Sequence, residues 1–173
     1  MQDIRRALRR FFVVRVTCNG ENKMITADLI IPALEATSKK KAFRAIAEEI
    51  AGEIGGDTDD LLTALLDRER IGTTGIGLGV AIPHIKIAGA ERMYGVLVRL
   101  ETPVDYDAID DMPVDIIFML LAPAESKTTQ HLKMLAHISR FLKDAKTCEA
   151  IRAAKQTETL SAILAEWSSS QAA

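Results

Sequence analysis

Residues 72–86 read GTTGIGLGVAIPHIK, so a glycine-rich segment leads directly into the apolar triplet Val80–Ile82. Glycines tolerate positive φ and let the backbone approach a ligand closely, which predicts a loop that feeds a buried strand. Pro83 restricts the residue before it to extended conformations and fixes its own φ. We therefore expect the side chain of His84 to leave the end of this strand in a direction that the backbone sets.

A histidine presented in this way suits several chemical roles. Free imidazole has a pKa of about 6.5, so near neutral pH His84 can ligate a metal, act as a base or accept a phosphoryl group. The glycines match neither a P-loop nor a dinucleotide-binding loop, because Gly-Lys-Ser/Thr is absent and the spacing is Gly75-x-Gly77-x-Gly79. The alternative at this point is a tight turn into a core strand with an incidental histidine.

The composition is that of one globular domain. The 173 residues suffice for one core, and 48% hydrophobic with only 5% aromatic residues predict an aliphatic one. A formal net charge of -2 argues against nucleic-acid binding through the whole surface. Cys18 and Cys148 form neither a zinc pattern nor a disulfide framework, which favours a reducing, cytoplasmic location. No apolar run reaches the roughly 18 to 20 residues of a membrane helix.

Residues 1–24 differ from the rest of the chain. They carry five arginines around a short apolar run, which Arg15 interrupts after four residues, and no small-residue cleavage site follows. This excludes a secretory signal peptide. We expect a disordered N-terminal extension, or an upstream start with Met24 as the true one. A basic amphipathic arm for a membrane or nucleic acid is the alternative. The folded domain is then residues 25–173.

Hydrophobic periodicity predicts several helices. They are expected from Ser38 to Gly55-Gly56, from Asp57 or Thr58 to Gly72, from Ser126 or Thr128 through an apolar stripe of Leu132, Leu135, Ile138 and Leu142, around Thr147, and from Thr157 to Trp167. Residues 168–173 are expected to fray. The charge run Asp67–Arg70, at the end of the second helix, is interpreted as a solvated face.

Apolar runs between these helices predict the strands. Leu29–Leu34 is a short apolar patch broken by Pro32, Arg92–Leu100 suggests a strand, and Val114–Leu121 reads as a buried central strand. A polar turn is expected after His84. The aspartate-rich segment Thr102–Pro113 lacks the glycine and glutamate of an EF-hand, so a surface loop is the better interpretation. Helices before, between and after the strands, without a repeat or linker, predict a single-domain α/β layer structure.

The third expected helix carries two further histidines. His131 lies near its start and His137 about a turn and a half later, so the two side chains point to different faces. They cannot chelate one metal together. We expect neither a metal nor another cofactor.

Three blocks of the sequence resemble one family. Residues 68–77, RERIGTTGIG, followed by Val80–His84, are similar to the signature of the enzyme IIA domain, fructose/mannitol class (type 2), of the bacterial phosphoenolpyruvate phosphotransferase system. Residues 103–115 and His131-Leu132 with Leu135 support the resemblance, which covers roughly residues 28–167. Without a IIB or membrane IIC segment, the chain most resembles the stand-alone, nitrogen-related IIA.

The resemblance implies a mixed β-sheet flanked by helices on both faces, and the family's phosphoryl transfer from an HPr-like phosphohistidine carrier. His84 would be the phosphoryl acceptor. His131 would support it by hydrogen-bonding the phosphoryl oxygens or steering the ring, and Arg68 would approach the same oxygens. No metal is required in principle, since backbone N–H groups, a guanidinium and an imidazole supply the donors. Regulatory target proteins would read the phosphorylation state.

Two residues depart from the family pattern. Ile85 stands where the family has glycine, and a β-branched residue disfavours positive φ, so a different or strained turn is expected there. Leu78 stands where a small polar residue is common. Two alternatives therefore stay open: a sugar-specific IIA that passes phosphate to a IIB partner, and a regulatory binding module that has kept the fold and lost phosphorylation.

Overall fold

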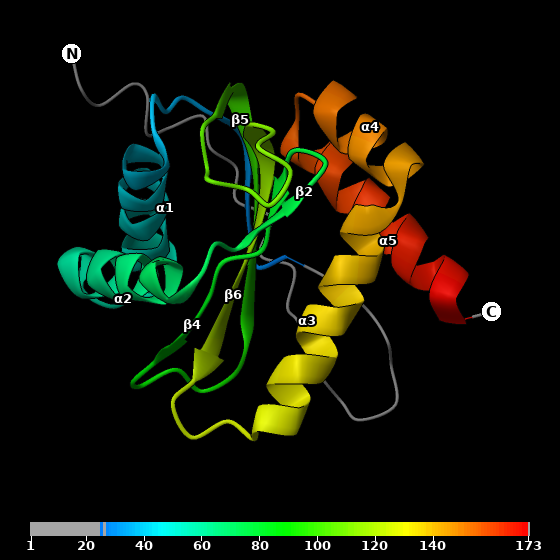
Figure 1. The fold of residues 1–173 in the computed structure, drawn as a ribbon. Coiled ribbons are helices and arrows are strands. Elements are labelled where there is room, and N and C mark those ends of the chain that lie inside the picture. The colour runs from blue at the N-terminus through cyan, green and yellow to red at the C-terminus, as the bar shows by residue number, and fades with distance from the viewer. Residues whose placement is uncertain (1–24, 26, 173) are drawn as a thin grey trace, which may run out of the picture.

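The fold is one mixed sheet between two groups of helices (Figure 1). The computed structural model describes residues 25 and 27–172. The expected N-terminal extension, residues 1–24, lies outside the described residues. The expected fold class, a single α/β domain with a mixed β-sheet and helices on both faces, is confirmed.

The sheet contains six strands among the described residues. They are β1 (Leu29–Leu34), β2 (Gly75–Gly77), β3 (Val80–Ala81), β4 (His84–Ile87), β5 (Tyr94–Val104) and β6 (Val114–Pro123). The order is β1-β5-β6-β3-β2, and β4 also pairs with β6. The β1–β5, β3–β6 and β4–β6 pairs are parallel, whereas β5–β6 and β2–β3 are antiparallel. The sheet is therefore mixed, with β6 inside it as predicted.

The helices form two groups. They are α1 (Lys39–Glu53) and α2 (Thr58–Ile71), then α3 (Thr128–Lys143), α4 (Ala145–Ala153) and α5 (Thr157–Ala172). Figure 1 shows α1 and α2 on one face of the sheet and the other three on the opposite face. Alternate residues of the strands point to opposite faces, so β5 sends Val96 and Val98 into one core and Leu97 into the other.

Local signals place the helix ends near the site. Ser38 begins α1 as predicted, because its hydroxyl accepts a hydrogen bond from the Lys41 amide. Of the two candidates for the next cap, Asp57 is the one, accepting from the amides of Asp59 and Asp60. Gly72 ends α2, as expected.

The glycine-rich stretch differs from the expected loop. It forms a small hairpin, β2–β3, and Pro83 interrupts the backbone between β3 and β4 while both strands keep pairing with β6. His84 therefore opens a further strand that was not expected, and the expected turn through Gly89 follows only after it, at residues 88–89. Of the two alternatives expected at Ile85, a different or a strained turn, the strained one does not occur, because Ile85 lies buried in β4 opposite Leu121 without positive φ. The positive φ falls instead on Leu78, at 58°, in the hairpin turn.

The start of α3 is the second difference. Lys127 precedes the helix without a side-chain cap, so neither Ser126 nor Thr128 caps it. Leu132, expected in the apolar stripe, is 57% exposed, while His131 and Phe141 are buried. The buried face of the helix includes His131 and Ile138, and Leu132 is turned away from it because successive residues on a helix lie about 100° apart.

The C-terminal end is also more ordered than expected. Helix α5 continues to Ala172, and Ser168 is buried instead of fraying. Its hydroxyl donates to the Ile25 carbonyl and accepts from the Ile25 amide, both at 2.9 Å. The first described residue thus holds the last helix in place.

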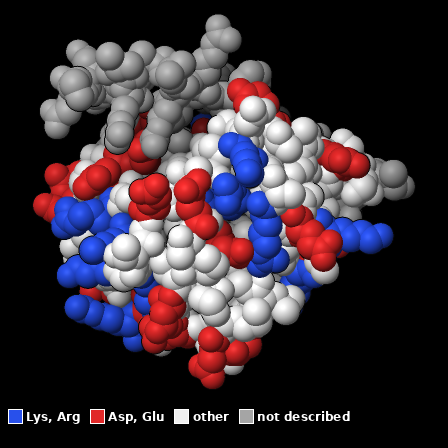
Figure 2. Space-filling view, turned by 90° about the horizontal axis from the view of Figure 1, so that it is seen from above, with Lys and Arg blue, Asp and Glu red and all other residues white. Residues whose placement is uncertain are grey.

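The surface carries mixed charge. On the face seen from above Figure 1, acidic side chains lie between the basic ones, and the described residues form no single continuous basic surface there (Figure 2). No helix in the described part of the chain is both long and apolar enough to cross a membrane.

Candidate functional site

The structure brings His84, Arg68 and His131 to one cleft. His84 is the first residue of β4, Arg68 lies in the last turn of α2 and His131 in the second turn of α3. An open cleft of about 400 Å³ is lined by all three side chains, together with Ala64, Asp67, Ile71, Ile85 and Lys86. It lies where α2 and α3 approach β4 from opposite faces of the sheet (Figure 1).

Two hydrogen bonds fix the tautomer of His84. Its Nδ1 lies 3.0 Å from the carbonyl oxygen of Ile82, which only accepts, so Nδ1 must carry the proton. The Arg68 Nε, which only donates, lies 3.0 Å from Nε2. Nε2 therefore carries the lone pair, and both contacts fit one neutral ring. The backbone carbonyl on one side and the guanidinium on the other leave Nε2 as the ring nitrogen without a proton.

The protonation state of His84 agrees with these contacts. Partial burial of the ring lowers the pKa of His84 below its ordinary value of 6.5, and the positive charge of Arg68 lowers it further. The hydrogen bond to Ile82 and the charge of Glu69 oppose the shift without reversing it. The lowered pKa favours the uncharged ring at neutral pH, with the lone pair on Nε2.

His131 stands beside this ring. The two ring centroids are 5.4 Å apart, with an angle of 61° between the planes. Burial lowers the pKa of His131, and the nearby His84 and Lys86 lower it further. Its Nδ1 is buried without a hydrogen-bond partner in the described part of the chain. His131 is thus a second neutral imidazole at the cleft, available as a donor or acceptor.

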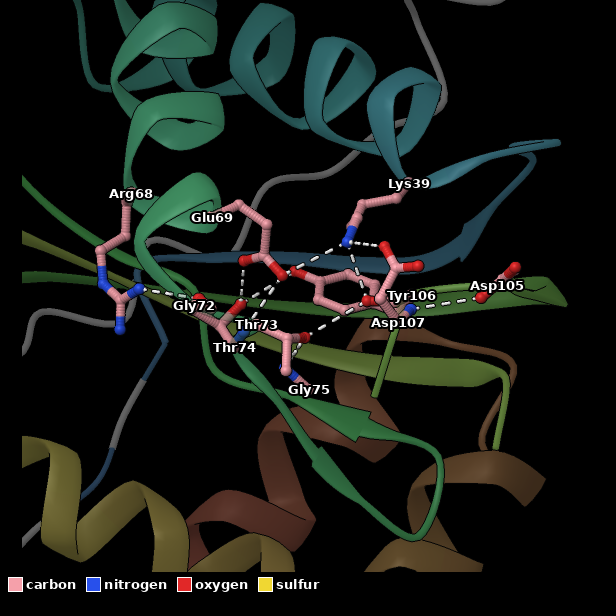
Figure 3. A network of polar contacts seen from close by, with 10 residues as sticks. All are labelled: Lys39, Arg68, Glu69, Gly72, Thr73, Thr74, Gly75, Asp105, Tyr106 and Asp107. Carbon is pink, nitrogen blue, oxygen red and sulfur yellow. Dashed lines mark hydrogen bonds and ion pairs between the residues drawn. The ribbon is translucent and has the colours of Figure 1, made fainter. Parts of the chain in front are cut away.

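Figure 3 shows a polar network around Glu69, the residue that follows Arg68 in α2. The interpretation of the charge run Asp67–Arg70 as a solvated face is wrong for Glu69. Asp67 and Arg70 are exposed and pair with each other, as expected of a solvated face. Glu69, however, is only 7% exposed at its side chain and accepts from the amide and the hydroxyl of Thr74. No sequence pattern marked it, because a charge between charges carries no periodic signal.

A second set of contacts fixes the hairpin. Arg152 of α4 makes two bonds to the Asp115 carboxylate, at 2.7 and 2.9 Å, and donates to the Leu78 carbonyl at 2.7 Å. Asp110 accepts from the Leu78 amide at 2.8 Å. The amide and the carbonyl of Leu78 are thus both hydrogen-bonded, which stabilises the positive φ of this residue.

Lys86 is a cleft residue that the sequence analysis missed. It follows His84 by two positions in β4, so both side chains leave the same face of the strand. Its Nζ donates to the carbonyl oxygens of Ala124 and Ser126 at 3.5 and 3.3 Å. The spacing of two residues between His84 and Lys86 was visible in the sequence, but it indicates a shared face only if residues 84–87 are recognised as a strand. Among the described residues no group of His, Cys, Asp and Glu has the arrangement of a metal site.

Comparisons with known proteins agree with this geometry. The family model of the phosphoenolpyruvate-dependent sugar phosphotransferase system, EIIA 2, matches residues 23–167. A nitrogen regulatory protein of Bradyrhizobium diazoefficiens is 39% identical over 142 residues, covering 82% of this chain and 92% of that protein. A fructose-specific EIIA component of Haloferax volcanii is 37% identical over 110 residues, covering 64% of this chain and 71% of that protein.

A solved structure has the same fold. The crystal structure of the nitrogen regulatory protein IIA-Ntr from Neisseria meningitidis superposes with a TM-score of 0.73 at 35% identity, covering 78% of this chain and 92% of that one. The sequence resemblance, made on three separate blocks, is thereby confirmed. The chain belongs to the EIIA type 2 family of the phosphoenolpyruvate-dependent phosphotransferase system.

Proposed function

We propose that the chain is a cytoplasmic phosphocarrier of a nitrogen-related phosphotransferase system, and that Nε2 of His84 accepts the phosphoryl group. The observation that carries the proposal is the pair of 3.0 Å hydrogen bonds that leave His84 neutral with its lone pair on Nε2, beside the Arg68 guanidinium. A nucleophile with a cation already next to it suits the transfer of a charged phosphoryl group.

The proposed reaction needs no group that the chain lacks. The Nε2 lone pair of His84 attacks phosphorus in line with the donor's P–N bond. The Nε2–P bond forms as the P–N bond breaks, and its electron pair returns to the donor imidazole. With the donor ring protonated on its second nitrogen, neither ring gains or loses a proton. The Ile82 carbonyl holds the Nδ1 proton of His84 throughout.

Arg68 and His131 have supporting roles in this proposal. Arg68 gives up its bond to Nε2 when phosphorus approaches, and its guanidinium then donates to the equatorial oxygens, which carry the charge. His131, neutral and 5.4 Å from His84 between ring centroids, donates to the same oxygens or limits rotation of the acceptor ring.

The donor is proposed to be an HPr-like phosphohistidine protein. Ile71 lines the cleft with 84% of its surface exposed, and Leu132, next to His131, is 57% exposed. Exposed apolar side chains around a reactive centre favour docking of another protein over binding of a small phosphate ester. Regulatory proteins of nitrogen, carbon or potassium control would then read the phosphorylation state, consistent with similarity to nitrogen regulatory proteins.

A second candidate function is a sugar-specific IIA that passes the phosphoryl group to a IIB partner. It is favoured by the similarity to a fructose-specific EIIA component. Both functions use the same chemistry at His84, so only the acceptor separates them. Transfer from the phosphorylated chain to a fructose- or mannitol-type IIB domain in a reconstituted assay would establish the sugar-specific role.

The third candidate is a binding module without phosphorylation. The argument for it from the sequence was that Ile85 replaces the glycine that follows the histidine in the family. Because Ile85 lies in an extended, buried strand, it does not distort the backbone at His84. If no donor labels the protein and regulatory partners still bind it, this alternative replaces the proposal.

The direct test is incubation with phosphorylated HPr-like carrier, followed by mapping of acid-labile phosphate. The chain contains three histidines, so His84→Gln, His131→Gln and His137→Gln cover every candidate. We expect His84→Gln alone to abolish labelling. Label that persists in His84→Gln would overturn the assignment.

A further inference from the structure

The network in Figure 3 is built around the buried carboxylate of Glu69. Its Oε1 accepts from the Thr74 amide at 3.0 Å, and its Oε2 accepts from the Thr74 hydroxyl at 2.6 Å. The Lys39 ammonium lies 3.4 Å from Oε1 and supplies the counter-charge. A carboxylate with 7% exposure requires such partners, because burying it unpaired is costly.

From Thr74 the contacts continue to the acceptor ring. The Thr74 carbonyl accepts from the Ile82 amide at 2.9 Å. The carbonyl of Ile82 is in turn the oxygen that holds the Nδ1 proton of His84 at 3.0 Å. Two residues, Thr74 and Ile82, thus connect the carboxylate of Glu69 to the ring of His84 through hydrogen bonds.

Glu69 also reaches the other side of His84. It follows Arg68 in α2, and its own carbonyl accepts from the Gly72 amide at 3.2 Å. The Arg68 Nη1 donates to the Gly72 carbonyl at 3.0 Å while Nε contacts His84 Nε2. The bond to Gly72 comes from the backbone of Glu69, whereas its carboxylate holds Thr74, so both ends of residues 72–74 are bonded to Glu69.

The far side of the network is anchored as well. Lys39 donates to the Tyr106 carbonyl at 2.8 Å and to Asp107 at 2.7 Å. The Tyr106 hydroxyl lies 3.1 Å from the Thr74 hydroxyl, and burial raises the pKa of Tyr106 well above its usual range, so it stays neutral. The carboxylate of Glu69 is thereby held from α1, from the glycine-rich stretch and from the loop after β5.

We infer that Glu69 is the positioning residue of the acceptor site: through Thr74 and Ile82 its carboxylate keeps the proton of His84 on Nδ1. The inference rests on the function proposed above for the transfer step. Its effect on the ring, however, exists in the unphosphorylated protein and is measured there.

The test compares Glu69→Gln with Asp59→Asn. Both changes remove one carboxylate charge from α2, but Asp59 lies in the first turn of the helix and does not line the cleft. Its side chain is exposed and pairs with Arg44. The amide of Gln cannot accept on both of its atoms, so the bonds to Thr74 are broken or rearranged. Thr74→Val removes the 2.6 Å bond with little change in size and serves as the second variant should Glu69→Gln not fold.

The first measurement is the nitrogen-15 NMR spectrum of the His84 ring in each unphosphorylated variant. We expect the wild type and Asp59→Asn to show one Nδ1–H tautomer, and Glu69→Gln and Thr74→Val to show a mixture with Nε2–H. The second is the rate of phosphoryl transfer, expected to fall between about tenfold and a hundredfold in Glu69→Gln, as for a small misplacement of reacting groups. Asp59→Asn should transfer at the wild-type rate.

Two outcomes would overturn the inference. A wild-type tautomer in both network variants, with only the midpoint of unfolding lowered, assigns Glu69 a structural role alone. An equal loss of transfer in Asp59→Asn attributes the effect to net charge. A wild-type protein that no donor phosphorylates refutes the proposed function instead, and a tautomer shift in Glu69→Gln would still support the positioning of His84.

Discussion

The two ring nitrogens of His84 have partners of different kinds, a backbone carbonyl on Nδ1 and a side chain on Nε2. A backbone carbonyl cannot change its hydrogen-bonding role, so Ile82 keeps the proton on Nδ1 whatever approaches the cleft. Arg68 is a side chain and can move away from Nε2. The permanent contact therefore lies on the nitrogen that keeps its proton, and the exchangeable contact lies on the one proposed to react.

The charge state of His84 makes a prediction about pH. Protonation occupies the Nε2 lone pair, so phosphoryl acceptance should fall as pH decreases through the pKa of the folded protein. Burial places that pKa below 6.5, so acceptance should persist at pH 6.5 and be lost only at lower pH. NMR titration of the ring protons gives the midpoint. A midpoint at or above 6.5 would contradict the buried, neutral ring described here.

Arg68 is expected to act on the rate and not on the fold. Arg68→Ala should slow phosphoryl transfer by roughly tenfold to a hundredfold, since a charge-assisted hydrogen bond is worth about 1.5–3 kcal/mol. Arg70→Ala is the matched control, because its guanidinium pairs with Asp67 on the exposed face of the same helix turn. Stopped-flow or quenched transfer from the carrier measures both. Equal rates in the two variants would remove Arg68 from the site.

At the scale of elements, the site depends on a hairpin whose glycines are close to other chain segments. A side chain on Gly75 would meet the Cβ of Ala108 at 2.9 Å and a ring carbon of Tyr106 at 3.2 Å. The β2 strand thus packs directly on the loop that carries Tyr106. At Gly75 the close contacts alone exclude a side chain. Gly77 and Gly79 have close contacts as well, and in addition their φ is positive.

Gly75→Ala should therefore destabilise the protein by about 1–3 kcal/mol, the range for overpacking. Gly52→Ala is the control, because a methyl group there meets nothing within 4 Å in α1, and it should stabilise by up to about 1 kcal/mol. Urea unfolding of both variants measures the difference. A Gly75→Ala protein as stable as the wild type would show that the hairpin and the Tyr106 loop can separate freely.

The elements also show what the sequence can predict. Caps such as Ser38, the continuous apolar run of β6 and the end of α2 at Gly72 follow from local rules, and the structure has them. The strand β4 was missed because four residues after a proline carry too little pattern and their partner is distant β6. Leu132 was misplaced because the polar His131 occupies the buried position beside it.

At the scale of the whole molecule, the two faces of the sheet each supply part of the site. Arg68 and Glu69 come with α2 on one face, and His131 comes with α3 on the other. Among the described residues that line the cleft, those in strands belong to β4. The resemblance to one family selected His84, Arg68 and His131 correctly as neighbours. Glu69, Lys39 and Lys86 depend on packing between distant segments, which local sequence patterns do not report.

The N-terminal residues are predicted to be dispensable for this arrangement. A chain starting at Met24 keeps Ile25, whose backbone is bonded to Ser168, and keeps nearly all of the family match at residues 23–167. We expect its rate of phosphoryl transfer to equal that of the full chain, and its thermal midpoint to lie within a few degrees of that of the full chain. Failure of the shortened chain to fold, or loss of transfer, would make residues 1–23 an integral part of the domain.

The most direct test of the account is the identity of the phosphorylated atom. The protein, labelled with nitrogen-15 histidine and phosphorylated by the carrier, is studied by phosphorus–nitrogen correlation NMR. The account predicts a coupling between phosphorus and Nε2 of His84, with the Nδ1 proton still present. A coupling to Nδ1 of His84, or to a ring nitrogen of His131 or His137, would contradict it.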